Sequence, residues 1–272
     1  MMMTAYWRTL PEIQLVVFDL DGTLADTKKD LALSVNAMRE YMGLGPLPLE
    51  AVTSYVGHGV TALVKRALGD KAPDGEVEKG LAFFLDYYGH HMLDNTLAYP
   101  GVHEALEGLG NRKLAILTNK PARYSREIIA GLGLASYFFE IYGGDSFPLK
   151  KPNPLGIKTL MTHVAIPAEN TLMVGDSDTD VLTGRSAGVW TCGVTYGYGP
   201  QALEEAGPDL LLRDLRDLPS ILDGRAGEEQ SAVGSGQQAA GSRQWTVGRR
   251  QSAVGSEQQA TGSQQRTADT KE

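Results

Sequence analysis

The fold of this chain is decided by the stretch Val16-Val17-Phe18-Asp19-Leu20-Asp21-Gly22-Thr23-Leu24. Its apolar start, which reaches back to Leu15, is typical of a strand buried on both faces of a parallel sheet. Asp19 and Asp21 follow at the carboxyl end of this strand, where open α/β sheets bind their ligands. Two carboxylates so close repel each other unless a cation lies between them or one of them holds a proton. The pair therefore indicates a hard metal ion, an acid–base couple, or both.

The same residue types also suit a plain turn followed by a helix N-cap, so the rest of the chain has to decide. At 272 residues the chain has room for one large or two modest domains, and its net charge of −8 argues against a non-specific nucleic-acid surface. Cys192 is the only cysteine, which excludes an internal disulfide and fits a reducing compartment. No apolar run approaches the roughly 20 residues of a membrane helix, and residues 1–10 lack the apolar core of a signal peptide. We expect a cytoplasmic protein that binds neither nucleic acid nor membranes, of an oligomeric state that the sequence does not indicate.

A helical insertion follows the first strand. Apolar residues recur at helical spacing from Leu31 to Met42, and further helical patterns start near Leu49, Val60 and Glu76. No convincing strand pattern occurs between residues 27 and 95, and about 70 residues are too many for an ordinary α/β connection. We therefore predict a helical cap domain at 27–95, inserted into an α/β core formed by 1–26 and 96–223.

Strand and helix patterns alternate after Pro100. The expected strands are 113–119, 138–142, 171–176, 189–194 and a weaker one at 209–212, with helices between them. Repeated units of this kind predict an α/β fold with a doubly wound parallel sheet.

The composition changes again at residue 224, where Gln, Ser, Gly, Ala and Thr take over. A segment that begins at Gln230 recurs at Gln251. The apolar content is too low to offset the entropy lost on ordering, so we expect a disordered, low-complexity tail at 224–272.

Polar residues follow four of the predicted strands and loops. They are Asp19 and Asp21, Thr118 and Asn119, Lys151, and Asp176 and Asp180. Each has a structural alternative, such as a helix cap for Thr118 or a solvated loop cation for Lys151. Because the carboxyl ends of parallel strands meet at one edge of the sheet, we expect these side chains to form one site.

The same motifs, in the same order, identify a resemblance to the haloacid dehalogenase-like phosphatases over residues 13–222. They are Asp19-Leu20-Asp21-Gly22-Thr23, Leu117-Thr118-Asn119, Lys151-Pro152, and Gly175-Asp176 through Asp180. Softer stretches, including Val56-Gly57-His58-Gly59, Thr118-Asn119-Lys120-Pro121 and Tyr196-Gly197-Tyr198-Gly199, look like those of phosphoglycolate phosphatases.

The resemblance implies a Rossmann-like core and Mg²⁺-dependent hydrolysis of a small phosphorylated metabolite, with 2-phosphoglycolate as the favoured substrate. Asp19 would attack phosphorus and form an aspartyl-phosphate, and Asp21 would act as general acid and base. Lys151 and Thr118 would hold the phosphoryl oxygens. The metal would be held by Asp19, the backbone carbonyl of Asp21 and Asp176, with Asp180 orienting Lys151 or a metal-bound water.

Substrate contacts are expected from Asn119 and from the cap residues Gly57, His58 and Arg66. A helix cap for His58 and a surface charge for Arg66 are the structural alternatives. Within the same superfamily, other small phosphoesters, pyrophosphate, phosphonates or a sugar-phosphate mutase reaction stay open. A non-catalytic binding protein that keeps the fold is the alternative of another class.

Overall fold

The computed structural model of the chain describes residues 11–69, 71–224 and 246–247. Its main sheet has seven strands in the order β5-β4-β1-β6-β7-β8-β9, and all neighbours pair in parallel except β8 and β9. The strands are β1 (Leu15–Phe18), β4 (Lys113–Leu117), β5 (Glu140–Tyr142), β6 (Thr171–Gly175), β7 (Trp190–Val194), β8 (Leu210–Leu212) and β9 (Thr246–Val247). The predicted doubly wound α/β sheet is thereby confirmed.

Strand β1 lies in the middle of the sheet, between β4 and β6. Its residues alternate between two apolar cores, with Val16 and Phe18 in one and Leu15 and Val17 in the other. Successive strands lead outward from β1 on one side as β4 and β5, and on the other side as β6, β7 and β8. Strand order therefore reverses at β1, which is where such sheets bind ligands.

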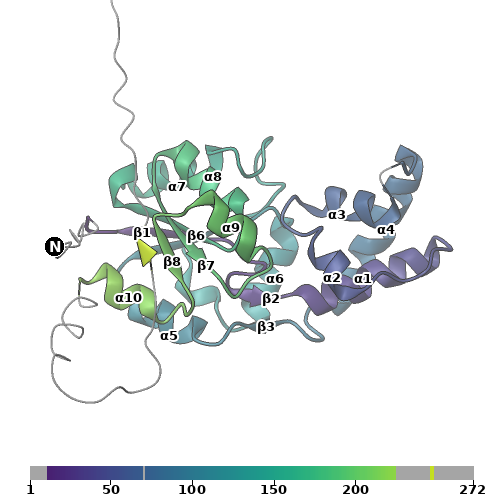
Figure 1. The fold of residues 1–272 in the computed structure, drawn as a ribbon, viewed down its shortest axis with the longest axis horizontal. Coiled ribbons are helices and arrows are strands. Elements are labelled where there is room, and N and C mark those ends of the chain that lie inside the picture. Colours follow the sequence, from purple (N-terminus) through teal and green to yellow (C-terminus); the bar gives the residue numbers. More distant parts are fainter. Residues whose placement is uncertain (1–10, 70, 225–245, 248–272) are drawn as a thin grey trace, which may run out of the picture.

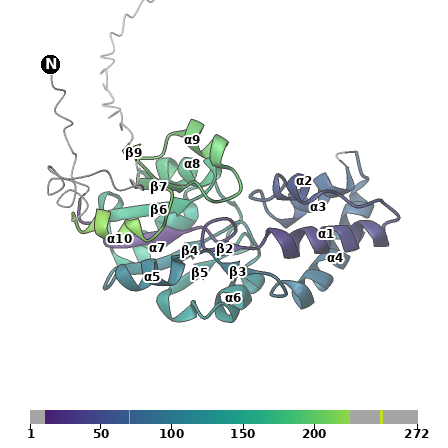
Figure 2. The same ribbon diagram turned by 60° about the horizontal axis from the view of Figure 1, so that its bottom comes forward.

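Helices cover both faces of the sheet, as Figures 1 and 2 show. Residues of α5 (Val102–Gly108), α6 (Ala122–Gly131) and α10 (Asp217–Leu222) share one apolar core with β1. Residues of α7 (Leu155–Val164) and α8 (Asp178–Ala187) belong to the other core. The short helix α9 (Pro200–Ala206) packs against α8 and β7.

Residues 27–95 form a helical lobe to one side of the sheet (Figure 1). Its helices are α1 (Lys28–Tyr41), α2 (Leu49–Thr53), α3 (Val60–Leu68) and α4 (Asp74–His91). The described part of this segment contains no strand. Helix α4 packs along α1, so the two longest helices of the lobe lie against each other.

Two short strands join the lobe to the sheet. Strand β2 (Ala25–Asp26) pairs antiparallel with β3 (Leu97–Ala98), and the sequence patterns did not predict this ribbon. Beside it, the buried carboxylate of Asp30 accepts hydrogen bonds of 2.7–2.9 Å from the backbone and side chains of Asn95 and Thr96. The two chain segments that connect the lobe to the sheet are thus joined by hydrogen bonds at the edge of the lobe.

Within the expected tail, the structure describes residues 246–247, which form strand β9 and pair antiparallel with β8. Both copies of the tail repeat lie outside the described residues. Among the described helices, none is both long and apolar enough to cross a membrane.

Candidate active site

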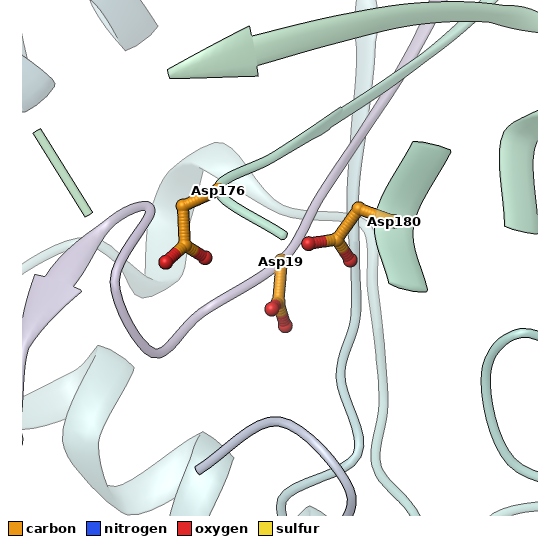
Figure 3. A group of neighbouring side chains, drawn as sticks. All are labelled: Asp19, Asp176 and Asp180. Carbon is orange, nitrogen blue, oxygen red and sulfur yellow. The ribbon is translucent and has the colours of Figure 1, made fainter. Parts of the chain in front are cut away.

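Three carboxylates meet at the carboxyl edge of the central strands. Asp19 follows β1, Asp176 follows the neighbouring β6, and Asp180 lies in the first turn of α8. All three are buried, and one oxygen from each lies within 4.8 Å of the others. Asp19 lies between the other two (Figure 3). Carboxylate oxygens gathered in this way are the ligands that Mg²⁺ and other hard cations prefer.

Asp19 is held in a position that disfavours its charge. Burial raises its pKa from 3.8 to about 6, with Lys151 opposing the shift and Asp180 adding to it. Its Oδ1 lies 2.9 Å from the Lys151 ammonium and accepts no further hydrogen bond from the described residues. Lys151 is therefore the only partner that the described residues give to this oxygen of Asp19.

Asp176 is fixed from two sides. Its oxygens accept hydrogen bonds from the Thr23 hydroxyl at 3.2 Å and from the Tyr198 backbone N–H at 2.7 Å. Gly22 and Gly197 approach it so closely that a Cβ on either would collide with its side chain. Burial, followed by the charges of Asp180 and Asp19, raises the pKa of Asp176 well above its usual value.

Lys151 is the positive centre of this acidic group. Its ammonium lies 2.6 Å from Asp180 Oδ1 as well as 2.9 Å from Asp19. Burial works against its charge, but Asp180 and Asp19 outweigh burial and raise the pKa of Lys151. The second oxygen of Asp180 accepts a 2.6 Å hydrogen bond from Ser177, as part of the capping box that begins α8.

The charges of the cluster do not balance. Three carboxylates face one lysine, and the pKa values of Asp19 and Asp176 are both raised. A divalent cation bound among these oxygens would supply the missing positive charge, so the residues fit a metal site. The side chain of Asp21 does not belong to this cluster.

Asp21 is paired with a second buried lysine. Lys120 Nζ donates to both of its oxygens, at 3.0 and 3.3 Å, and the Thr27 hydroxyl donates at 2.6 Å. The Lys120 ammonium also lies 4.6 Å from the centre of the Tyr88 ring, which belongs to α4 of the helical lobe. Burial opposes the charge on Lys120, but Asp21 outweighs it and raises the pKa of Lys120. Lys120 belongs to the motif Thr118-Asn119-Lys120-Pro121, but its sequence position alone predicts no role for it.

Thr118 and Asn119 follow β4 beside this pair. The Thr118 backbone N–H donates to Tyr142 on β5 at 3.0 Å, which fixes the buried Thr118 at the edge of the sheet. Asn119 binds backbone on both sides. Its amide nitrogen donates to the carbonyls of Gly57 at 2.8 Å and Lys151 at 3.1 Å, and its oxygen accepts from the Lys151 N–H at 2.9 Å. Asn119 therefore positions the Lys151 loop and connects it to the lobe.

A cavity of about 410 Å³ lies between the sheet edge and the helical lobe. The sequence-predicted residues on its wall are Asp19, Asp21, Gly57, His58, Thr118, Asn119 and Asp176. Arg66, predicted as a substrate contact, does not line the cavity and lies in the last turn of α3. Most of the wall that the lobe provides is apolar, with Leu31, Val56, Val60, Leu63, Phe84 and Leu85.

Comparison with known proteins gives consistent matches. Residues 16–194 match the haloacid dehalogenase-like hydrolase family model. A phosphoglycolate phosphatase of Neisseria meningitidis is 38% identical over 231 residues, which cover 81% of this chain and 98% of that protein. One from Pseudomonas fluorescens is 40% identical over 220 residues, covering 77% and 80%. The crystal structure of a predicted phosphoglycolate phosphatase from Haemophilus somnus 129pt is similar with a TM-score of 0.74 at 32% identity, covering 78% of this chain and 99% of that one.

Proposed function

The chain belongs to the haloacid dehalogenase-like hydrolase family and is a phosphatase, and from this premise we propose that it hydrolyses 2-phosphoglycolate to glycolate and phosphate. The reaction would pass through a phosphorylated Asp19. The observation that carries the proposal is the pairing of Asp19 with Lys151 beside two further buried carboxylates, at the cavity between the sheet edge and the helical lobe. The similarity to proteins named phosphoglycolate phosphatase supports the choice of substrate.

In the first half of the reaction, an oxygen of Asp19 attacks phosphorus. The new bond joins phosphorus to the Asp19 oxygen, and the bond to the ester oxygen breaks with its electron pair. Asp21 gives a proton to the leaving oxygen, which departs as the alcohol group of glycolate. Lys151, together with Thr118, holds the phosphoryl oxygens while negative charge spreads over them.

In the second half, Asp21 takes a proton from a water molecule. The water oxygen bonds to phosphorus, and the bond between phosphorus and Asp19 breaks. Asp19 returns to its carboxylate form and inorganic phosphate is released, so both acids end the cycle as they began it.

Asp19, Asp176 and the backbone carbonyl of Asp21 would hold Mg²⁺, with Asp180 orienting Lys151. When bound, the ion offsets the repulsion between the Asp19 carboxylate and the anionic phosphate. The support for it is the excess of buried carboxylates over lysines in the cluster.

The helical lobe 27–95 would serve as a cap domain on a core of 1–26 and 96–223, with the β2–β3 ribbon as the connection between them. The cap would exclude bulk water from the phosphoenzyme and surround the organic end of the substrate. Gly57 and His58 are its proposed contacts, because both line the cavity.

Phosphate release from a panel of phosphate esters tests the proposal, with Mg²⁺ or with EDTA. We expect 2-phosphoglycolate to lead the panel, and EDTA or Asp19→Asn to abolish release. Asp74→Asn, an exposed acid of the cap, is the matched control and should keep full activity. Another leading ester with the same dependence would refute the substrate, and an active Asp19→Asn protein would refute the mechanism. Phosphoryl return to a sugar phosphate would indicate a mutase.

A further inference from the structure

The cavity contains one strongly basic side chain at its wall. Among the described residues that line it, Lys120 is the only lysine or arginine. Lys151 is not among the lining residues, and its ammonium is paired with Asp19 and Asp180. The basic group that a substrate meets on the side of Asp21 is therefore Lys120, with His58 on the loop of the cap as the other basic lining residue.

The place of Lys120 is set by Asp21. Its ammonium lies 3.0 Å from the carboxylate that would protonate the ester oxygen of the substrate. A group bonded to the carbon next to that oxygen would therefore lie close to Lys120. We propose that Lys120 binds the carboxylate of the substrate and so selects phosphate esters of 2-hydroxy acids. This inference rests on the proposed function and names the group that determines its specificity.

The rest of the wall supports this assignment. Besides Tyr88, the cap contributes to the wall the apolar side chains of Leu31, Leu63, Phe84 and Leu85. A carboxylate placed against these residues without a partner would lose its hydration and gain nothing in return. Lys120 has three N–H donors, so its ammonium has the capacity to bind a substrate carboxylate in addition to Asp21.

Lys120 is also held ready for such a contact. Asp21 lies on one side of its ammonium and the Tyr88 ring on another, and the side chain is almost fully buried. A lysine already fixed in place loses little conformational freedom when a ligand binds, which favours affinity. Because Tyr88 belongs to α4, the same lysine lies at the contact between core and cap.

The test compares two esters of similar size, 2-phosphoglycolate and 2-hydroxyethyl phosphate, of which only the first carries a carboxylate. The quantity is the ratio of their kcat/KM values with Mg²⁺. We expect the wild type to favour 2-phosphoglycolate by at least tenfold, and Lys120→Met to lower the ratio about 10- to 100-fold, the range for loss of one charged hydrogen bond. Lys120→Arg should keep most of the preference.

Lys150→Met is the matched control. Lys150 is exposed, and its ammonium lies beside Gly59 on the same cap loop as His58, so the change removes a neighbouring charge outside the cavity wall. We expect it to leave the ratio unchanged. The inference is overturned if the wild type shows no preference, if Lys120→Met lowers both reactions equally, or if Lys150→Met gives the selective loss.

Binding to Asp19→Asn protein separates this inference from the proposed function. If the wild type hydrolyses neither ester, the proposed function fails, and calorimetric binding of the two esters still reports on Lys120. In the Asp19→Asn background, we expect 2-phosphoglycolate to bind more tightly than 2-hydroxyethyl phosphate, and we expect Lys120→Gln to remove this difference. Lys120→Gln is a second neutral variant, for the case that Lys120→Met does not fold. Equal affinities for the two esters before and after that change would overturn the inference.

Discussion

Two buried lysines, each paired with one acid after β1, divide the site into a core half and a cap half. Lys151 lies between Asp19 and Asp180, and both of these ion pairs are formed with residues of the core. Lys120 pairs with Asp21 and packs against Tyr88 of the cap. The difference shows how one residue type serves two purposes. Lys151 lies among acids of the core and stabilises their negative charge. Lys120 lies at the contact with the cap, where it can bind a group of the substrate.

Loss of Lys151 should have the largest effect. Lys151→Met leaves Asp19 and Asp180 buried without their cation, so we expect activity to fall about 10³-fold or more. The free energy of unfolding of the metal-free protein should fall by about 3–5 kcal/mol. Phosphate release and urea unfolding measure the two losses. Lys150→Met, its exposed neighbour, should change stability by less than about 0.5 kcal/mol, and a similar loss in both variants would contradict the account.

Asp19→Asn tests the excess of negative charge around Lys151. Because burial raises the pKa of Asp19 from 3.8 to about 6, the folded metal-free protein keeps a proton there between about pH 4 and 6 that the unfolded chain releases. The free energy of unfolding therefore falls as pH rises through this window, by up to about 3 kcal/mol. Asp19→Asn removes that loss. Urea unfolding in EDTA should find the variant more stable than wild type at pH 7 and nearly equal at pH 4, while an equal difference at both pH values would contradict this.

Lys120→Met should destabilise the protein less than Lys151→Met. In this variant Asp21 keeps its hydrogen bond from Thr27. Because the Asp21 side chain is 11% exposed, water can replace part of the stabilisation that the Lys120 ion pair provides. We expect a loss of about 1–2 kcal/mol in urea unfolding. A loss as large as that of Lys151→Met would mean that the two lysines do not divide the site as described.

Tyr88 should give the smallest effect. Tyr88→Leu removes the ring beside the Lys120 ammonium, and we expect it to weaken binding of 2-phosphoglycolate by up to about fivefold, from a contact worth about 1 kcal/mol. Tyr88→Phe keeps the ring and is the matched control, with nearly unchanged binding. Calorimetry with Asp19→Asn protein measures both, and equal effects of the two changes would exclude a role for the ring.

The sequence predicted the core half of the site better than the cap half. Asp19 and Asp176 each follow an apolar strand, and parallel strands bring such residues to one edge, so their meeting follows from local pattern and topology. The same pattern placed Lys151 and Asp180 among the candidates, and the family resemblance gave them their expected roles. The structure brings these four together, while their catalytic roles stay predictions.

The cap half depends on contacts that no local pattern encodes. The Lys120 ammonium lies over the Tyr88 ring, where α4 contacts the core. Asp30 accepts a hydrogen bond from Thr96, which is far from it in the sequence. A single motif position such as Lys120 does not indicate whether its charge points to solvent or to a partner. Nearness in sequence to His58 suggests Arg66 as a substrate contact, but Arg66 lies in the last turn of α3 and is not among the residues that line the cavity.

The most direct test of the central claim is to look for the phosphoenzyme. The wild type is mixed with 2-phosphoglycolate and Mg²⁺, quenched in acid within one turnover and digested for mass spectrometry. The account predicts a phosphoryl group on the peptide that contains Asp19, and none in Asp19→Asn. A phosphoryl group on another residue, or full turnover by Asp19→Asn protein, would contradict it.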